Sequence, residues 1–187
     1  MTSPGPQGLS DRAAAEALAR RRYLLEHFFS DGSNDYMAAQ VAKNPKRFAT
    51  FCSLSMHDAE QAGAELSRCV KEYGMVGAML NDFQNGPDGK PIYYDEPQFD
   101  AFWKTVQELD VVVYIHPRFP HPAVIENLFG GRRALLGACW YRPRPTRLTI
   151  ARSFSVGVGT HLLGLCTNGV FDRFPNLKLA YVRSHGL

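Results

Sequence analysis

Apolar residues recur at steps of three or four over residues 58–74, which is the spacing of one face of an α-helix. Asp58 precedes this face as a candidate N-cap, with Gln61 at the spacing of a capping box, and Gly74 follows it as a terminator. The next residues, 75–80, are apolar without alternation, which predicts a parallel strand covered on both faces. The apolar face of the helix consists of Ala59, Ala62, Leu66, Val70 and Tyr73.

The same succession of helix and strand recurs along the chain. Pro97 lies in the first turn of a predicted helix whose apolar face carries Phe99, Phe102, Val106 and Leu109. Four such units indicate an α/β fold with a parallel sheet, either open or closed into a barrel. The predicted pairs are helix 36–44 with strand 47–52, helix 58–74 with strand 75–80, the helix after Pro97 with strand 111–115, and helix 156–167 with strand 177–182.

Polar residues after the predicted strands favour the closed barrel. Asn81 and Asp82 follow one strand, His116 and Arg118 follow the next, and His185 follows the last. The carboxyl ends of the strands meet at the active site in a (β/α) barrel. No Gly-x-Gly-x-x-Gly or Walker-type loop follows a predicted strand, which makes an open nucleotide-binding fold the weaker alternative.

Two stretches do not fit this succession. Residues 20–33 interrupt the approach to the first helix, and residues 140–152 form a Pro- and Arg-rich run without an apolar period. Both are expected to be insertions. A complete barrel takes about 250 residues, whereas the chain has 187. We therefore expect a single domain over residues 1–187 that holds part of a TIM-type barrel and is incomplete at both ends.

Composition limits the class of protein. A hydrophobic content of 45% with 21% charged residues is typical of a globular domain. The N-terminus lacks the pattern of a secretory signal, and no apolar run approaches the ~20 residues of a membrane helix. A cytoplasmic protein without a membrane partner is expected. The four cysteines are widely spaced, so they are interpreted as small buried residues rather than a zinc cluster or disulfide framework.

Positive charge is concentrated in one segment. The net charge is +3, and residues 127–171 contain six arginines without Asp or Glu. With Trp140 and Tyr141 interleaved, this segment offers phosphate contacts and stacking surfaces for a nucleic acid. Such a run is more often a solvated loop, and no recognition helix or RNA-binding signature accompanies it. Nucleic-acid binding stays an unfavoured alternative, and no nucleic-acid partner is expected.

His116 and Arg118 are the main candidates for chemistry. A histidine at the end of an apolar parallel strand is held rigidly enough to bind a metal, and a core histidine bonded to a carbonyl is the alternative. Arg118 lies in a Pro-rich stretch, where its guanidinium would bind a substrate carboxylate through two parallel hydrogen bonds. An ordinary surface arginine is the alternative there.

Asn81, Asp82 and His161 allow two interpretations each. Asn81 and Asp82 would orient a substrate or a metal-binding histidine, or they form a polar turn that ends a strand. His161 lies inside an apolar helix, where a packing histidine is expected rather than a catalyst.

Six short motifs follow one another in a fixed order. They are residues 2–8, 34–36, 44–48, 77–82, 114–118 and 167–175. Together they resemble the amidohydrolase-related proteins of the aminocarboxymuconate-semialdehyde decarboxylase type. The strongest similarity within that group is to the dihydroxybenzoate and γ-resorcylate decarboxylases.

This resemblance implies a (β/α)₈ barrel with one catalytic divalent metal, zinc or manganese. It implies an enzyme, a non-oxidative carboxy-lyase that acts on small hydroxylated aromatic carboxylic acids, with a hydrolase of the same family as the alternative. The metal would act as a Lewis acid on a substrate oxygen. His116 matches the metal-binding histidine of the family, and Arg118 accompanies it in the same motif. Family members commonly form dimers or tetramers, so a homo-oligomer is expected.

The chain also departs from the family pattern. The first-strand pair of metal ligands and the last-strand aspartate have no match here. The family continues after its equivalent of strand 177–182 with Gly-His-Leu-Gly-Glu, whose histidine takes part in proton transfer. Arg183 occupies that position, and His185 fits as the catalytic histidine only if the strand end shifts by two residues. Since catalytic metal sites use about three protein ligands, a non-catalytic barrel fragment is the second hypothesis.

Overall fold

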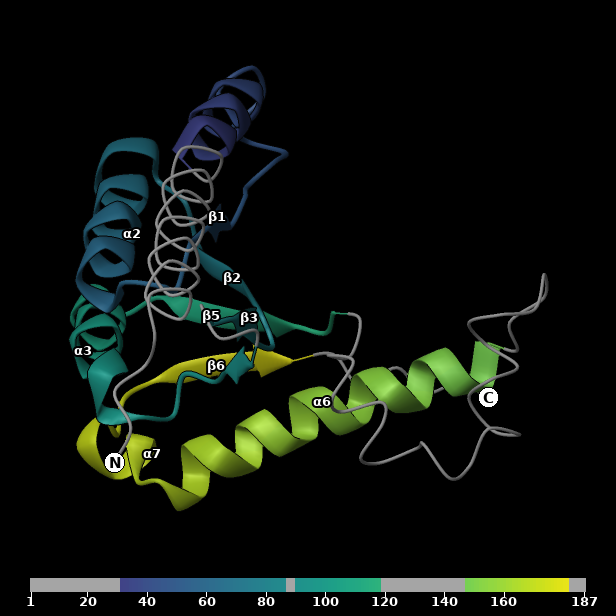
Figure 1. Cartoon of the computed structure of the whole chain (residues 1–187). Helices are drawn as coiled ribbons and strands as arrows, with labels where there is room; N and C mark the ends of the chain where they lie inside the picture. The colour runs from purple at the N-terminus through teal and green to yellow at the C-terminus, as the bar shows by residue number, and fades with distance from the viewer. Residues whose placement is uncertain (1–30, 87–89, 119–146, 182–187) are drawn as a thin grey trace, which may run out of the picture.

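A four-stranded parallel sheet in the order β1-β2-β5-β6 forms the centre of the computed structural model (Figure 1). The structure describes residues 31–86, 90–118 and 147–181, with only the backbone for 147–156. The parallel α/β arrangement confirms the fold class predicted from the sequence, and the sheet is open within the described residues. The strands are β1 (Cys52–Ser53), β2 (Gly77–Asn81), β5 (Val112–His116) and β6 (Lys178–Tyr181).

Helix α2 (Ala59–Tyr73) has the boundaries that its sequence predicts. The Asp58 carboxylate accepts a hydrogen bond from the Gln61 amide at 3.0 Å, which satisfies one free donor of the first turn. Gly74 ends the helix in the left-handed region, at φ 66°, and its amide donates to the Val70 carbonyl at 3.2 Å.

Helix α3 (Asp100–Leu109) follows a 3₁₀ turn, η1 (Pro97–Phe99). Phe102 and Val106 are buried on the predicted apolar face, and Leu109 packs against the same core. The helix after Pro97 is therefore confirmed, with its first turn wound more tightly than an α-helix.

Both helices cover the same face of the sheet, where α2 and α3 lie side by side (Figure 1). Side chains of alternate strand residues join their apolar faces in one core, which includes Ala78, Leu80, Val113 and Ile115. The other face of the strands is not covered in this way, and Met79 is 42% exposed there. The prediction that residues 75–80 are covered on both faces is thus wrong, because the described helices α2 and α3 pack on one side only.

The close approach of β2 and β5 depends on Gly77. Its backbone has φ 153°, and a β-carbon there would collide with the backbone carbonyl oxygen of Val112. Glycine is the residue that permits this contact. The two strands can then pair over their full length, from Gly77 opposite Val112 to Asn81 opposite His116.

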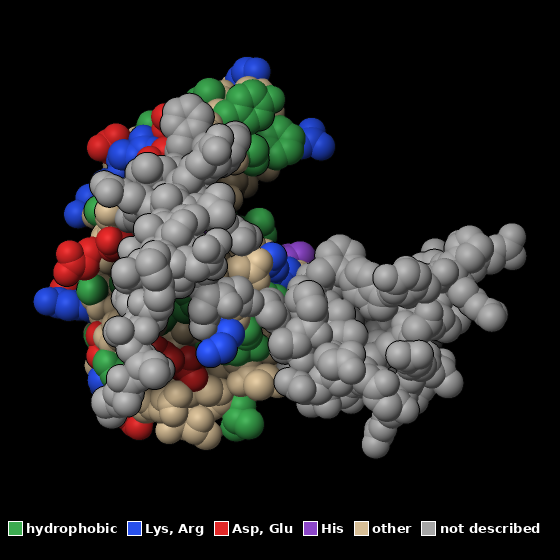
Figure 2. All heavy atoms as spheres, in the orientation of Figure 1, with side chains coloured by type: hydrophobic (Ala, Val, Ile, Leu, Met, Phe, Trp, Pro, Cys, Tyr) green, Lys and Arg blue, Asp and Glu red, His purple; other side chains and the backbone are tan. Residues whose placement is uncertain are grey.

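The first predicted helix and strand differ from the structure. Residues 31–41 are helical, and the strand is reduced to the two residues of β1. The reason is a turn at Asn44, whose carbonyl accepts from the Arg47 and Phe48 amides, both at 3.1 Å. Those amides are no longer free to join a sheet. Tyr36, Met37 and Phe48 are exposed large hydrophobic residues within residues 31–50. Figure 2 shows apolar side chains at the upper end of the molecule.

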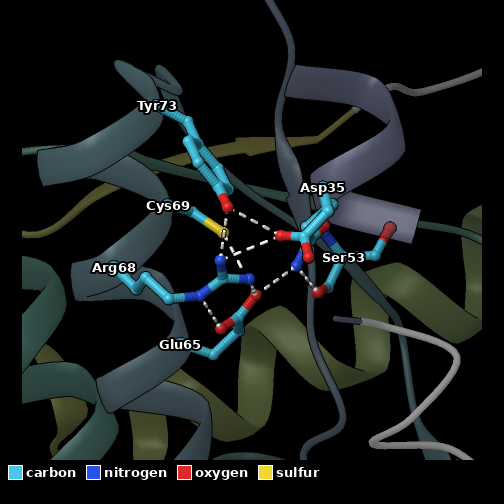
Figure 3. Close-up of polar contacts among 7 residues, drawn as sticks. Asp35, Ser53, Glu65, Arg68, Cys69 and Tyr73 are labelled. Carbon is cyan, nitrogen blue, oxygen red and sulfur yellow. Dashed lines mark hydrogen bonds and ion pairs between the residues drawn. The ribbon is translucent and has the colours of Figure 1, made fainter. Parts of the chain in front are cut away.

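A polar network attaches the helical residues 31–41 to β1 and α2 (Figure 3). Asn34 is 2% exposed, and its side-chain amide bonds both the carbonyl (3.0 Å) and the amide (2.8 Å) of Ser53. The same amide donates to Glu65 at 2.8 Å, and Arg68 bridges Glu65 and Asp35. Side chains from the helical residues 31–41 and from α2 thus form one network, which also satisfies both backbone groups of Ser53 in β1.

The C-terminal elements follow the prediction more closely. Helix α6 (Arg147–Thr167) contains the predicted helix and begins earlier, and β6 lies within the predicted strand 177–182. Residues 147–152 and 31–33 are helical although they belong to the expected insertions, and the rest of those stretches lies outside the described residues. Three short elements were not predicted: β3 (Gln84–Asn85), β4 (Pro91–Ile92) and α7 (Val170–Arg173).

Cysteine burial was predicted correctly for two of the described positions. Cys52 and Cys69 are fully buried, whereas Cys166 is exposed, because it lies on the outer side of α6. Cys139 lies outside the described residues. Among the helices that the structure describes, none has the length and apolar character needed to cross a membrane.

Candidate functional site

Asn81 and His116 lie side by side at the carboxyl ends of two paired strands. They are the last residues of β2 and β5 and are partners in the register of the sheet. Both are exposed on the face that α2 and α3 leave uncovered. His116 has the Tyr114 ring edge-on at 5.7 Å between ring centroids. The core-histidine interpretation of His116 is therefore wrong, and the imidazole is accessible to a ligand.

Asp82 connects the two strand ends through its backbone and its side chain. Its amide donates to the His116 carbonyl at 3.0 Å, and its Oδ1 accepts from the Arg118 amide at 3.2 Å. These two bonds hold the chain on both sides of Pro117. Asp82 is 2% exposed, unlike the solvated side chain of a turn that only ends a strand. Asp82 is therefore a buried residue that contacts the backbone at both His116 and Arg118.

Burial disfavours the charged form of Asp82 and raises the pKa of its carboxyl group to about 6. The Arg118 amide and guanidinium, its own backbone and nearby His116 oppose this shift by favouring the carboxylate. The carboxylate is consequently held by hydrogen bonding and positive charge in a place that water does not reach.

Arg118 lies beyond the end of β5, over the Phe83 ring. Its Nη1 donates to the Phe83 carbonyl at 3.1 Å, and its guanidinium carbon is 4.7 Å from the ring centroid. Among the described residues, Nε and Nη2 have no acceptor. The guanidinium is half-buried, so stacking fixes its plane while donors remain for an anionic ligand.

His161 of α6 is a buried packing residue, as the sequence predicts. It is 1% exposed, and its Nε2 accepts the Tyr94 amide at 3.0 Å. The Tyr93 and Tyr94 rings lie 5.4 and 5.0 Å away between centroids. Burial lowers the pKa of His161 to about 4, although the Asp95 charge and the Asp82 backbone act in the opposite direction. The ring is therefore neutral, with its proton on Nδ1.

The described residues do not by themselves form a metal centre. They contain no group of three or more His, Cys, Asp or Glu side chains that could hold an ion. His116 offers one imidazole, while the nearby Asp82 carboxylate is bound to the Arg118 amide. Because metal sites use about three protein ligands, this donor set fits only part of one. His185 and most of the arginine-rich segment lie outside the described residues.

The sequence identifies the residues at the strand ends but not the residues of α6 that contact them. Gly157 faces the Asp82 carboxylate, and His161 lies one turn further along the helix. The available signal was their separation of four residues in a helical segment, which places both on one side. Nothing in the local sequence indicated which loop that side contacts.

A protein-family model described as Amidohydrolase matches residues 8–183 of the chain. Gamma-resorcylate decarboxylase of Polaromonas sp. (strain JS666 / ATCC BAA-500) is 39% identical over 180 residues, which cover 96% of this chain and 48% of that protein. Gamma-resorcylate decarboxylase of Rhizobium sp. (strain MTP-10005) is 36% identical with the same coverage. The chain spans about half the length of these relatives.

Solved structures that are similar to this chain also include decarboxylases of dihydroxybenzoic acids. A dihydroxybenzoic acid decarboxylase from Polaromonas sp. JS666, with bound manganese and the inhibitor 2-nitroresorcinol, is similar with a TM-score of 0.68 and 41% identity. That match covers 81% of this chain and 42% of the other. The 2,6-dihydroxybenzoate decarboxylase from Rhizobium has a TM-score of 0.66 and 37% identity, covering 91% of this chain and 45% of the other.

Proposed function

Since the chain belongs to the amidohydrolase family, we propose that its strand-end site serves the non-oxidative decarboxylation of hydroxylated aromatic acids. The observation that carries this proposal is the pairing of His116 with Asn81 on the uncovered face, with Arg118 directly beyond. An imidazole, an amide and a guanidinium next to one another match the donors that a hydroxylated benzoic acid requires. Relatives named as decarboxylases of such acids support the proposed reaction.

Arg118 is the proposed anchor of the substrate carboxylate. Its guanidinium plane is fixed by the Phe83 ring and carbonyl, so two parallel hydrogen bonds to a carboxylate need little further ordering. Asn81 offers amide donors to a ring hydroxyl from the neighbouring strand. Asp82 contributes indirectly, because its bonds to the 116–118 backbone keep His116 and Arg118 at a constant separation.

His116 is the proposed ligand of a divalent metal, zinc or manganese, as manganese is bound in the similar Polaromonas structure. A metal in this family's sites supplies positive charge that polarises a bound oxygen. The remaining ligands have to come from outside the described residues, since these supply one. His185 is kept as the proposed proton donor on the resemblance alone. A homo-oligomer and a cytoplasmic location likewise remain predictions from the sequence.

The test compares the full chain with His116→Ala in manganese binding and in CO₂ release from 2,6-dihydroxybenzoate. In the wild-type chain, added manganese should broaden the His116 ring resonances before those of other residues. The substitution should reduce metal affinity about tenfold or more. Glu108→Gln is the control, because this exposed carboxylate on α3 lies just before the amino end of β5, and the variant should bind as wild type. Unchanged CO₂ release in His116→Ala would contradict the ligand assignment.

A non-catalytic barrel fragment is the second candidate. The absence of a three-ligand group among the described residues favours it. It predicts that the chain binds 2,6-dihydroxybenzoate through Arg118 but releases no CO₂ with either zinc or manganese. Metal-dependent release by the chain alone would exclude this candidate.

A further inference from the structure

We propose that helix α6 positions Asp82, and through it the His116–Arg118 segment, by leaving room for the Asp82 carboxylate at Gly157. Gly157 and His161 are thus positioning residues for the strand-end site. The inference rests on the proposed function for its purpose, but the contact can be tested without metal or substrate.

The Asp82 carboxylate is held between α6 and the segment after β5. Its Oδ1 accepts from the Arg118 amide at 3.2 Å. Its Oδ2 points to α6, where a β-carbon added at Gly157 would lie only 2.7 Å away. Real side chains do not approach a carboxylate oxygen this closely. The missing side chain at Gly157 is therefore what allows the carboxylate to keep its bond to Arg118.

The same side of α6 is fixed against the chain by three further residues. His161 accepts the Tyr94 amide at 3.0 Å, and Asn168 donates to Asp95 Oδ2 at 2.8 Å. Between them, Gly164 leaves space for the same Asp95 carboxylate, which an added β-carbon would meet at 2.5 Å. Positions 157, 161, 164 and 168 follow helical spacing, so the helix contacts residues 82, 94 and 95 along one line.

This arrangement decides what moves when a methyl group is added at Gly157. The helix backbone is fixed by His161 and Asn168, whereas the Asp82 carboxylate is the end of a short side chain that can rotate. The carboxylate should therefore turn away and lose the Arg118 amide. Alanine is also a better helix former than glycine, which offsets part of the cost of the lost hydrogen bond. The exchange rate of the Arg118 amide reports the loss of positioning, and the melting temperature reports the loss of stability.

Gly157→Ala and Gly159→Ala form a matched pair for the experiment. Gly159 is two residues along the same helix, and an added β-carbon there would meet nothing within 4 Å. In the full chain without metal, we expect the Arg118 amide to exchange with solvent about tenfold faster in Gly157→Ala, because it loses its acceptor. Gly159→Ala should leave that exchange unchanged and should melt at or above the wild-type temperature. Gly157→Ala combines the same gain in helix propensity with the loss of a buried hydrogen bond, so it should melt below Gly159→Ala.

A double variant tests whether the effect passes through Asp82. Asp82→Ala removes the acceptor, so adding Gly157→Ala to it should not accelerate exchange at Arg118 any further. If Gly157→Ala accelerates exchange of the Arg118 amide as much in the Asp82→Ala background as in the wild type, the inference is overturned. A wild-type exchange rate in the single Gly157→Ala variant would also overturn it.

Titration with 2,6-dihydroxybenzoate separates this inference from the proposed function. If the site binds aromatic acids, Gly157→Ala should weaken the shift of the Arg118 resonances while Gly159→Ala does not. Binding that is equal in both variants despite faster exchange would overturn a positioning role in ligand binding. No binding by the wild-type chain, together with faster exchange in Gly157→Ala, would contradict the proposed substrate and leave the positioning of Asp82 supported.

Discussion

Asp82 and His161 are two buried ionisable side chains whose pKa shifts have opposite consequences for stability. Burial lowers the pKa of His161 to about 4, so protonation is easier in the unfolded chain. Its contribution is complete above pH 6.5 and is lost as the pH falls towards 4. The pKa of Asp82 is raised to about 6, so its contribution is complete below pH 3.8 and is lost as the pH rises to 6. The two effects largely cancel over this range.

Replacing His161 by Gln should reveal the hidden pH dependence. Gln keeps an acceptor for the Tyr94 amide but does not titrate. The stability advantage of the wild type over His161→Gln should grow by about 3 kcal/mol between pH 4 and pH 7. Urea unfolding at half-unit pH intervals measures this difference. Parallel stability curves would show that His161 is not buried as a neutral ring.

At the residue scale, the sequence predicts which strand-end side chains meet but not their burial. His116 and Asn81 were identified because apolar strands end there, and the parallel register places them together. The sequence left open whether Asp82 belongs to a solvated turn. Its carboxylate lies against Gly157 of α6, a residue far away in the chain. A local pattern contains no information on such a contact.

At the scale of elements, Asn34 joins the helical residues 31–41 to the edge strand β1. Its side chain satisfies both backbone groups of Ser53 and also binds Glu65, at 2.8 to 3.0 Å. Asn34→Ala would leave these partners without their bonds in a place that is nearly closed to water. Because unsatisfied buried groups are costly, we expect a loss of about 1–3 kcal/mol in urea unfolding and faster exchange of the Ser53 amide.

Gln40→Ala is the control for this prediction. Gln40 lies in the same helical segment and accepts an exposed hydrogen bond from Lys43 at 2.7 Å. An exposed bond of this kind contributes little, so the change should stay within about 0.5 kcal/mol. Equal effects of the two substitutions would mean that the attachment to β1 does not stabilise the chain.

Elements with a strong apolar period were predicted with nearly correct boundaries, as α2 and α3 show. Elements defined by single contacts were not. β1 is short because the turn at Asn44 uses the amides of Arg47 and Phe48, and the β3–β4 pair is too short for any periodicity. The start of α6 was missed because residues 147–152 have no apolar face of their own.

At the scale of the whole molecule, the described sheet has one covered and one uncovered face. Leu80 and Met79 are neighbours in β2 that point to opposite sides, with exposures of 1% and 42%. A strand inside a closed barrel would bury both. The uncovered face is therefore where this sheet differs from the sheet of a closed barrel. It is also the surface on which the oligomer predicted by the resemblance can be tested.

The pair Met79→Gln and Leu80→Gln tests this with the same polar side chain on each face. If the Met79 face is open, Met79→Gln should change the free energy of unfolding by about 0.5 kcal/mol or less. Leu80→Gln should cost about 3 kcal/mol or more, because it places an amide in the core. Urea unfolding at two protein concentrations measures both values. A large, concentration-dependent cost for Met79→Gln would instead show that a second copy covers this face, since only association makes stability depend on protein concentration.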